Sequence, residues 1–447
     1  MKEIPCNIIK NAENEAKEMF SKFEEISMFN QRKVMNSFRE NKVSARHFNH
    51  TTGYGYDDVG RETLCRIFAE SFGSEKAIVS PLIASGTHAL TIALFGLLRP
   101  GNRILSITGD PYDTLHRVIT GEDIGSLKDF GINYDSIPML NDKIDYQAVT
   151  TYLSTNSTDL IFITRSKGYT FRDALSVDEI KVATEFIKSI SPNSIVFVDN
   201  CYGEFVEMSE PCAVGADIMV GSLIKNPGGG LAPTGGYIAG KEKLIDNVCN
   251  RVTAPSIGLE IGSYNTSYLP FFQGFFMAPA IVENALKTGV VAAYAYTSLG
   301  FAVSPLPNVM PHDLIRAIKF DSDKELIEFI RAIQYSSVVD SFVTPFPWAM
   351  PGYVDNVIMA GGSFIQGGSL ELSADAPIRR PYTAYLQGAL TYQHGKIAIE
   401  ETLGRIFAYR EKKEAEELAR KESGYDPSGK IDIEALINEA KKKYNKK

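Results

Sequence analysis

The chain has 447 residues, of which 44% are hydrophobic, and a formal net charge of −8 at pH 7. This length exceeds what one hydrophobic core usually holds, so two domains are expected. The negative charge, with no basic block outside the very end of the chain, argues against nucleic acid as the principal partner. The amino terminus lacks the apolar core of a signal peptide, and the scattered cysteines contain no C-x-x-C pair, so we expect a cytoplasmic enzyme with reduced thiols.

Residues 1–50 have the charged, amphipathic pattern of a helical arm that precedes the first core element. The arm ends near His47 and His50, which are of a residue type that binds metals. No cysteine or nearby third ligand accompanies this pair, so no metal site is expected there.

From about residue 58 onward, strand-like and helix-like stretches alternate along the chain. We expect strands over residues 76–82, 102–108, 158–164, 194–199, 216–221 and 236–239. Such alternation predicts an α/β fold with a mostly parallel sheet that helices cover on both faces. This large domain is expected to span residues 51–300.

An apolar stretch over residues 271–301 raises the question of a membrane span. Charged residues such as Lys287 interrupt it, so a long buried helix near 274–300 is the better interpretation, and no membrane is expected as a partner. The helix should lead into a smaller α+β domain over residues 301–410. Beyond that domain, residues 411–447 alternate acidic and basic side chains, which is typical of a solvated appendage.

The most informative pattern is an apolar strand that ends in Asp199, followed by a second strand that leads to Lys225. An enzyme that holds pyridoxal phosphate (PLP) needs a carboxylate to keep the pyridine nitrogen protonated and a lysine to form a Schiff base. In open α/β sheets, ligands bind at the carboxyl edge of the strands. Ser222, three residues before the lysine, strengthens this interpretation. Alone, Asp199 would be an ordinary turn cap and Lys225 an ordinary loop lysine.

The same segment also matches a different catalytic pattern. Ser222 and Lys225 have the S-x-x-K spacing of serine β-lactamases, and residues 287–289 supply a K-T-G triplet. The S-D-N element of that signature is missing, and the triplet lies in a helix-like stretch instead of on a strand. We therefore set this interpretation aside.

Two further segments are suited to a phosphate-bearing cofactor. Ser85, Gly86 and Thr87 follow a strand and open a helix-like run, so their amides and hydroxyls would meet a phosphate at a helix amino end, although such a triplet is also a common helix start. Tyr112 follows the next strand, where its ring can stack on the pyridine ring or simply contribute to packing.

The loop over residues 54–61 does not have the spacing of a dinucleotide-binding G-x-G-x-x-G motif. It instead offers Tyr54, Tyr56 and Arg61 ahead of the first core helix. A loop of this kind can present a tyrosine and an arginine to a phosphate, and we expect it to do so across a subunit interface.

Taken in order, the motifs of this sequence resemble those of a known enzyme family. The segments G-Y-G-Y-D-D-V-G-R, S-G-T-H-A, D-P-Y-D-T-L, V-D-N-C-Y-G-E-F, G-S-L-I-K-N-P-G-G-G and E-L-S-A-D-A-P-I-R resemble the methionine gamma-lyase family of aluminium resistance proteins over about residues 10–410. The relatives of this family include cystathionine beta-lyase within the aspartate aminotransferase fold. The resemblance implies a PLP-dependent homodimer or homotetramer with shared active sites and carbon–sulfur lyase activity on a sulfur-containing amino acid.

The resemblance also implies roles for individual residues. Lys225 would be the Schiff-base lysine and the group that moves the Cα proton, Asp199 the partner of the pyridine nitrogen, and Tyr112 the stacking ring. The implied phosphate contacts are Gly86, Thr87 and Ser222 from the same chain, next to the Ser85 hydroxyl that the local sequence already offers, with Tyr56 and, less directly, Arg61 from the neighbouring subunit.

An amino-acid substrate also needs a group that binds its carboxylate, and the guanidinium fork of arginine suits that task. Arg379 matches the family motif and is preferred over Arg380, with Tyr54 as a second substrate contact; a surface ion pair is the alternative for Arg379. Other PLP reactions at Cα, such as transamination or aldol cleavage, stay open, as does a PLP-binding protein with little turnover. The pattern does not choose between β- and γ-elimination.

Overall fold

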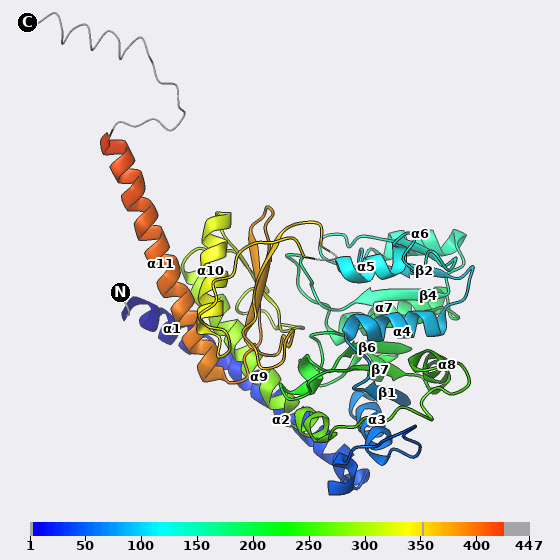
Figure 1. Ribbon diagram of the computed structural model, residues 1–447. Helices are drawn as coiled ribbons and strands as arrows, with labels where there is room; N and C mark the ends of the chain where they lie inside the picture. The colour runs from blue at the N-terminus through cyan, green and yellow to red at the C-terminus, as the bar shows by residue number, and fades with distance from the viewer. Residues whose placement is uncertain (1–2, 351–352, 424–447) are drawn as a thin grey trace, which may run out of the picture.

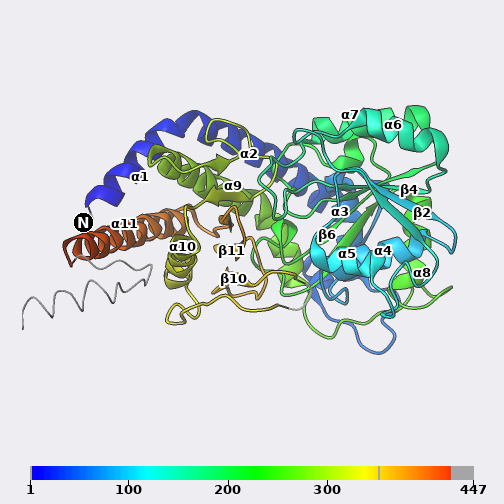
Figure 2. The same cartoon turned by 90° about the horizontal axis from the view of Figure 1, so that it is seen from above.

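The computed structural model describes residues 3–350 and 353–423 (Figure 1). The later part of the expected charged appendage, residues 424–447, lies outside these described residues. Two domains are visible side by side in Figures 1 and 2, each with its own sheet, and long helices run along both.

Within the described residues, a sheet of seven strands forms the centre of the large domain, in the order β1-β7-β6-β5-β4-β2-β3. The strands are β1 (Lys76–Ser80), β2 (Arg103–Ser106), β3 (Asn133–Ser136), β4 (Leu160–Thr164), β5 (Ile195–Asp199), β6 (Ile218–Ser222) and β7 (Gly236–Gly240). Pairing is parallel from β3 through β6, whereas β7 runs antiparallel to both of its neighbours. The expected strands are confirmed, and the carboxyl ends of β4, β5 and β6 meet at one edge.

Helices cover both faces of this sheet, which explains why its central strands are apolar throughout. Figure 2 shows α6 and α7 on one face and α4, α5 and α8 on the other. The helices of this domain are α3 (Val59–Phe72), α4 (Gly86–Leu97), α5 (Asp113–Thr120), α6 (Tyr146–Thr155), α7 (Val177–Ile190) and α8 (Glu242–Val252), with short 3-10 turns η1 (Ala45–Phe48), η2 (Pro211–Val214) and η3 (Asn226–Gly228).

The smaller domain has an antiparallel sheet with the order β10-β11-β12-β9-β8 in the described part of the chain. Its elements are β8 (Val303–Ser304), β9 (Arg316–Lys319), α10 (Asp323–Ser336), β10 (Val357–Ala360), β11 (Ser373–Pro377), β12 (Thr383–Gln387) and α11 (Tyr392–Ser423). A separate appendage was expected to begin after residue 410. Helix α11 instead continues past this point, because the sequence there keeps strong helix formers without a break.

The long helix α9 (Leu269–Ser298) joins the two domains and confirms the expected buried helix. It is the one described helix that is long and apolar enough to cross a membrane, and 61% of its apolar window is buried inside the protein. Phe275 in its first half packs in the core of the large domain, and Tyr296 near its end packs in the core of the small domain. A core helix of this kind needs no bilayer to cover it.

The amino-terminal arm is helical, as expected, and contributes to both cores. Helix α1 (Glu3–Glu15) buries Ile9 against the small domain, and α2 (Lys17–Glu40) buries Phe23 against the large one. The arm therefore tethers the two domains instead of standing apart from them.

Candidate active site

Asp199 and Lys225 lie at the same edge of the large sheet. Asp199 is the last residue of β5, is 3% exposed, and accepts a hydrogen bond from the Cys201 amide (3.1 Å). Lys225 follows the parallel neighbour β6 and is largely buried, with its Nζ 3.9 Å from the ring centroid of Tyr202. The two side chains that the sequence singled out for one cofactor are thus brought together by adjacent parallel strands.

Burial and charge act against each other at this pair. Burial raises the pKa of Asp199, while the charge of Lys225 and the Cys201 amide pull it down. Burial would lower the pKa of Lys225, but its acidic neighbours Cys201, Tyr202 and Asp199 outweigh burial and raise it. A buried carboxylate in this position favours a protonated nitrogen beside it.

The start of α4 and the end of β6 form a second cluster beside this pair. Ser85 caps α4 by accepting a hydrogen bond from the His88 amide (3.1 Å). A Cβ atom on Gly86 would lie 3.1 Å from the Cβ of Ser222, so the absent side chain allows this close approach. In the described residues, the Ser222 Oγ is buried and has no hydrogen-bond partner. An unsatisfied hydroxyl at a helix amino terminus fits the phosphate of PLP.

Tyr112 lies between the two clusters. Its hydroxyl is 2.8 Å from the Thr87 Oγ1, and the charges of Asp199 and Lys225 both act on it. Burial, followed by the charge of Asp199, raises the pKa of the Tyr112 phenol, so this side chain is neutral and remains available as an apolar ring.

Three residues near Lys225 were not predicted from the sequence. Tyr202 has a backbone φ of 72°, a strained conformation for a residue with a side chain and one that recurs at functional sites. Asp375 on β11 is partly buried, and burial raises the pKa of its carboxyl to about 6. Tyr169 lies close enough to this carboxyl to oppose the effect of burial on its pKa. Asp375 comes from the other domain, and the D-N-C-Y segment after β5 was the only local signal for Tyr202.

A buried ionic network supports the loop that follows Asp199. Arg165 is fully buried, and its guanidinium donates to the side chains of Asn200 (2.8 Å) and Glu207 (2.8 Å). A Cβ on Gly203 would lie 2.5 Å from the Nη1 of Arg165, so glycine is required at this position. The network fixes the path of the chain between the carboxylate and the strained tyrosine.

The loop residues expected to serve a neighbouring subunit lie apart from this site within their own chain. Tyr54 and Tyr56 are 66% and 63% exposed and pack against each other, with ring centroids 5.6 Å apart. No hydrogen bond or ion pair joins them to Lys225 or Asp199 in the part of the chain that the structure describes.

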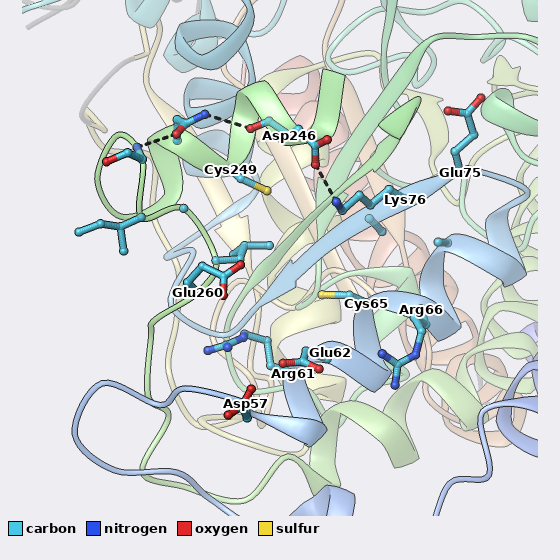
Figure 3. A pocket seen from close by; sticks show the side chains of 17 residues that line it. Asp57, Arg61, Glu62, Cys65, Arg66, Glu75, Lys76, Asp246, Cys249 and Glu260 are labelled. Atoms are coloured by element: carbon cyan, nitrogen blue, oxygen red, sulfur yellow. Dashed lines mark hydrogen bonds and ion pairs between the residues drawn. The ribbon is translucent and has the colours of Figure 1, made fainter. Parts of the chain in front are cut away.

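Arg61 is 5% exposed and donates a hydrogen bond from its Nη1 to the Gly262 carbonyl (3.0 Å). It lines a separate cavity of about 470 Å³ between α3, β1 and α8, together with Cys65 and Cys249 (Figure 3). The Arg61 side chain therefore stabilises the loop at residue 262. The Gly262 amide in turn donates a hydrogen bond to the Tyr54 carbonyl (2.7 Å), which fixes the Tyr54 backbone.

Arg379 lies just beyond β11 and is exposed. Its Nη1 donates to the Asp355 carboxylate (2.9 Å), which is the surface ion pair considered as the alternative. Its charge still reaches Tyr385 on the neighbouring strand and opposes the effect of burial on the pKa of that phenol.

The β-lactamase interpretation fails on the position of its second motif. Residues 287–289 lie within α9, and Lys287 forms ion pairs with Glu24 (2.8 Å) and Glu283 (2.7 Å). A K-T-G motif in such enzymes is placed on a strand.

Comparison with known proteins agrees with this geometry. The chain matches the methionine gamma-lyase family over residues 6–407. It is 53% identical to the Bacillus subtilis protein YnbB over 380 residues, which are 84% of this chain and 90% of that protein.

Two solved structures extend the comparison. A carbon–sulfur lyase involved in aluminium resistance from Clostridium novyi is 46% identical, with a TM-score of 0.87 over 90% of this chain and 96% of that one. The PLP-dependent protein YhfS from Escherichia coli shares the fold at 14% identity, with a TM-score of 0.59 over 86% of this chain and 97% of that one.

The fold is the aspartate aminotransferase-like fold of PLP-dependent enzymes. The chain belongs to the methionine gamma-lyase family and is a PLP-dependent carbon–sulfur lyase. The expected fold class, cofactor and reaction class are thereby confirmed.

Proposed function

We propose that Lys225, Asp199 and the start of α4 hold PLP at the carboxyl edge of the large sheet, where the enzyme eliminates a thiol from a sulfur-containing amino acid. The observation that carries this proposal is the position of Asp199 and Lys225 at the ends of paired parallel strands. The unpartnered Ser222 hydroxyl beside Gly86, in the described part of the chain, supplies the matching phosphate contact.

Each residue has a task that its surroundings support. When bound, PLP draws electrons from the amino-acid Cα and so acidifies its proton. Lys225 forms the covalent link to the cofactor, takes the Cα proton and delivers it elsewhere on the substrate. With PLP bound, Asp199 would keep the pyridine nitrogen protonated, and Tyr112 would supply an apolar ring to pack against it. Ser85, Gly86, Thr87 and Ser222 bind the phosphate.

We further propose that Arg379 binds the substrate carboxylate. Its place beyond β11, close enough for its charge to act on Tyr385, supports the assignment. Arg379 must then leave Asp355 when substrate arrives, and the exchange is inexpensive because Arg379 is exposed and Asp355 is only partly buried.

The exposed tyrosine pair points to an assembly. Within the described residues, the Tyr54 and Tyr56 side chains contact neither Lys225 nor Asp199, and two large exposed rings in contact mark a surface that a partner can cover. We propose that they complete the substrate and phosphate sites of a neighbouring subunit in a cytoplasmic homo-oligomer that is at least a symmetric dimer.

A panel of amino acids tests the proposed reaction. With L-cystathionine, L-methionine and L-cysteine, elimination releases a keto acid together with ammonia, whereas transamination needs a keto-acid acceptor and frees no ammonia. Lys225→Ala is the matched control and should release nothing. Keto acid formed only when an acceptor is added would replace the lyase assignment with the aminotransferase alternative, which no comparison supports.

A further inference from the structure

A cluster of tyrosine rings, here called the tyrosine wall, lies where the two domains meet. Tyr169, from the large domain, packs against Tyr385 on β12 (ring centroids 5.1 Å apart) and against Tyr353 (6.0 Å) in the segment before β10. Tyr202 belongs to the same cluster and lies over Lys225. The rings therefore extend from the reacting lysine toward the small domain.

Asp375 lies against this wall. It is directly opposite Tyr385 in the β11–β12 ladder, and its Oδ2 accepts a hydrogen bond from Gln387 (3.3 Å). Its negative charge acts on Tyr169, Tyr202 and Tyr353.

No ion pair involves Asp375 among residues 3–350 and 353–423. Lys225 is the cation whose charge reaches it. The carboxylate therefore has no cation in direct contact with it within the described residues.

A partly buried carboxylate without a cation is costly, because desolvation penalises its charged form. A ligand cation removes that cost, and aromatic faces attract cations as well. Rings suit a weakly hydrated, alkylated cation better than a primary ammonium, whose N–H groups require several acceptors. Asp375 already accepts a hydrogen bond from Gln387 (3.3 Å), which leaves fewer acceptor positions for an ammonium.

We propose that Asp375, Tyr169, Tyr353 and Tyr385 form a cage for a sulfonium group at the distal end of the substrate. The cage deepens the proposed lyase function and rests on it. In a sulfonium amino acid, the C–S bond breaks with its electron pair moving to sulfur, so a neutral thioether leaves and no proton need be supplied to it. For S-methyl-L-methionine, water then completes the reaction to 2-oxobutanoate, ammonium, dimethyl sulfide and one proton.

The first test compares two substrates of the holoenzyme. S-methyl-L-methionine differs from L-methionine by one methyl group and one positive charge, and the wild type should prefer it by about 10-fold or more in kcat/KM. Asp375→Asn should reduce that preference to about 3-fold or less, because it slows the sulfonium substrate much more than it slows L-methionine. Asp321→Asn, at a carboxylate whose side chain is 90% exposed in the same domain, is the control and should change nothing.

The second test measures binding without turnover. Trimethylsulfonium, which has no reacting groups, should bind to the holoenzyme and lose about 10-fold in affinity in Asp375→Asn, as followed by NMR titration. Tyr353→Leu removes one ring without touching a charge and should also weaken binding, which keeps the test decisive if Asp375→Asn does not fold.

The outcomes distinguish a failure of the proposed cage from a failure of the proposed lyase activity. Trimethylsulfonium binding that depends on Asp375, without release of keto acid from any sulfur amino acid, supports the cage and overturns the proposed elimination. Elimination of L-methionine or L-cystathionine at least as fast as S-methyl-L-methionine, and unchanged in Asp375→Asn, overturns the cage and leaves the lyase intact.

Discussion

Gly86 at the start of α4 and Ser222 at the end of β6 are so close that a Cβ atom on Gly86 would lie 3.1 Å from the Cβ of Ser222. The contact joins the helix amino terminus to the strand that leads to the reactive lysine. A phosphate bound there meets backbone amides from one element and a hydroxyl from the other.

Ser222→Ala should therefore weaken PLP binding. Loss of one hydrogen bond to a charged group costs about 1.5–3 kcal/mol, which corresponds to roughly a 10- to 100-fold rise in the Kd for PLP. Titration of the apoenzyme with PLP measures the effect. Ser267→Ala, which removes an exposed hydroxyl elsewhere, is the control, and an unchanged Kd in Ser222→Ala would remove Ser222 from the phosphate site.

Asp199→Asn should retain PLP and lose most of its activity. The amide keeps the shape of the carboxylate but cannot hold the pyridine nitrogen protonated. The visible spectrum reports whether cofactor is present, and steady-state release of keto acid reports activity. Turnover near that of the wild type would mean that another group protonates the ring.

Glu204 provides a test of burial through pH. It is fully buried, accepts a hydrogen bond from the Tyr237 hydroxyl (2.8 Å), and has its Oε2 unpartnered in the described residues. Burial raises its pKa to about 8 from the model-compound value of 4.5. The folded protein therefore holds a proton that the unfolded chain releases, so the free energy of unfolding falls as pH rises from about 4.5 to about 8.

Glu204→Gln should remove this pH-dependent loss of the free energy of unfolding. The variant gains stability over the wild type progressively between pH 5 and pH 8, by on the order of 3 kcal/mol at the upper end. Urea unfolding at the two pH values checks the prediction, with Glu185→Gln as an exposed control. An advantage that does not change with pH would show that Glu204 is ionised in the folded state.

The shared site can be tested by subunit mixing. Lys225→Ala and Tyr56→Ala are each expected to be inactive, but a hybrid dimer contains one site with both residues intact. Random exchange makes about half of the dimers hybrid, so activity should recover to roughly a quarter of wild-type sites. No recovery after demonstrated exchange would place Tyr56 outside the partner's site.

The sequence predicts the centre of the site because the segment around Asp199 and the segment around Lys225 can each be recognised from a short stretch of sequence. Apolar strands that end in Asp199 and just before Lys225 can be recognised without knowledge of their neighbours, and the parallel sheet then brings them together. The edge strand β3 was missed because its sequence, N-Y-D-S, is polar and only partly buried. A hydrophobic pattern cannot identify such a strand.

The cage residues could not be predicted for a different reason. Tyr169 and Asp375 are more than 200 positions apart and meet only because the two domains pack together. The motif around Asp375 drew attention to Arg379 as the functional group. In the structure Arg379 is exposed and paired with Asp355, whereas the Asp375 carboxyl is close enough to Lys225 for the two charges to interact. Sequence spacing gives no information on which of these side chains lies near Lys225.

The most direct test of the account is the position of the cofactor on the chain. Holoenzyme reduced with borohydride, digested and mapped by mass spectrometry should carry the pyridoxyl group on Lys225, and Lys225→Ala should carry none. A pyridoxyl group on any other lysine of the wild-type enzyme would contradict the assignment of the site.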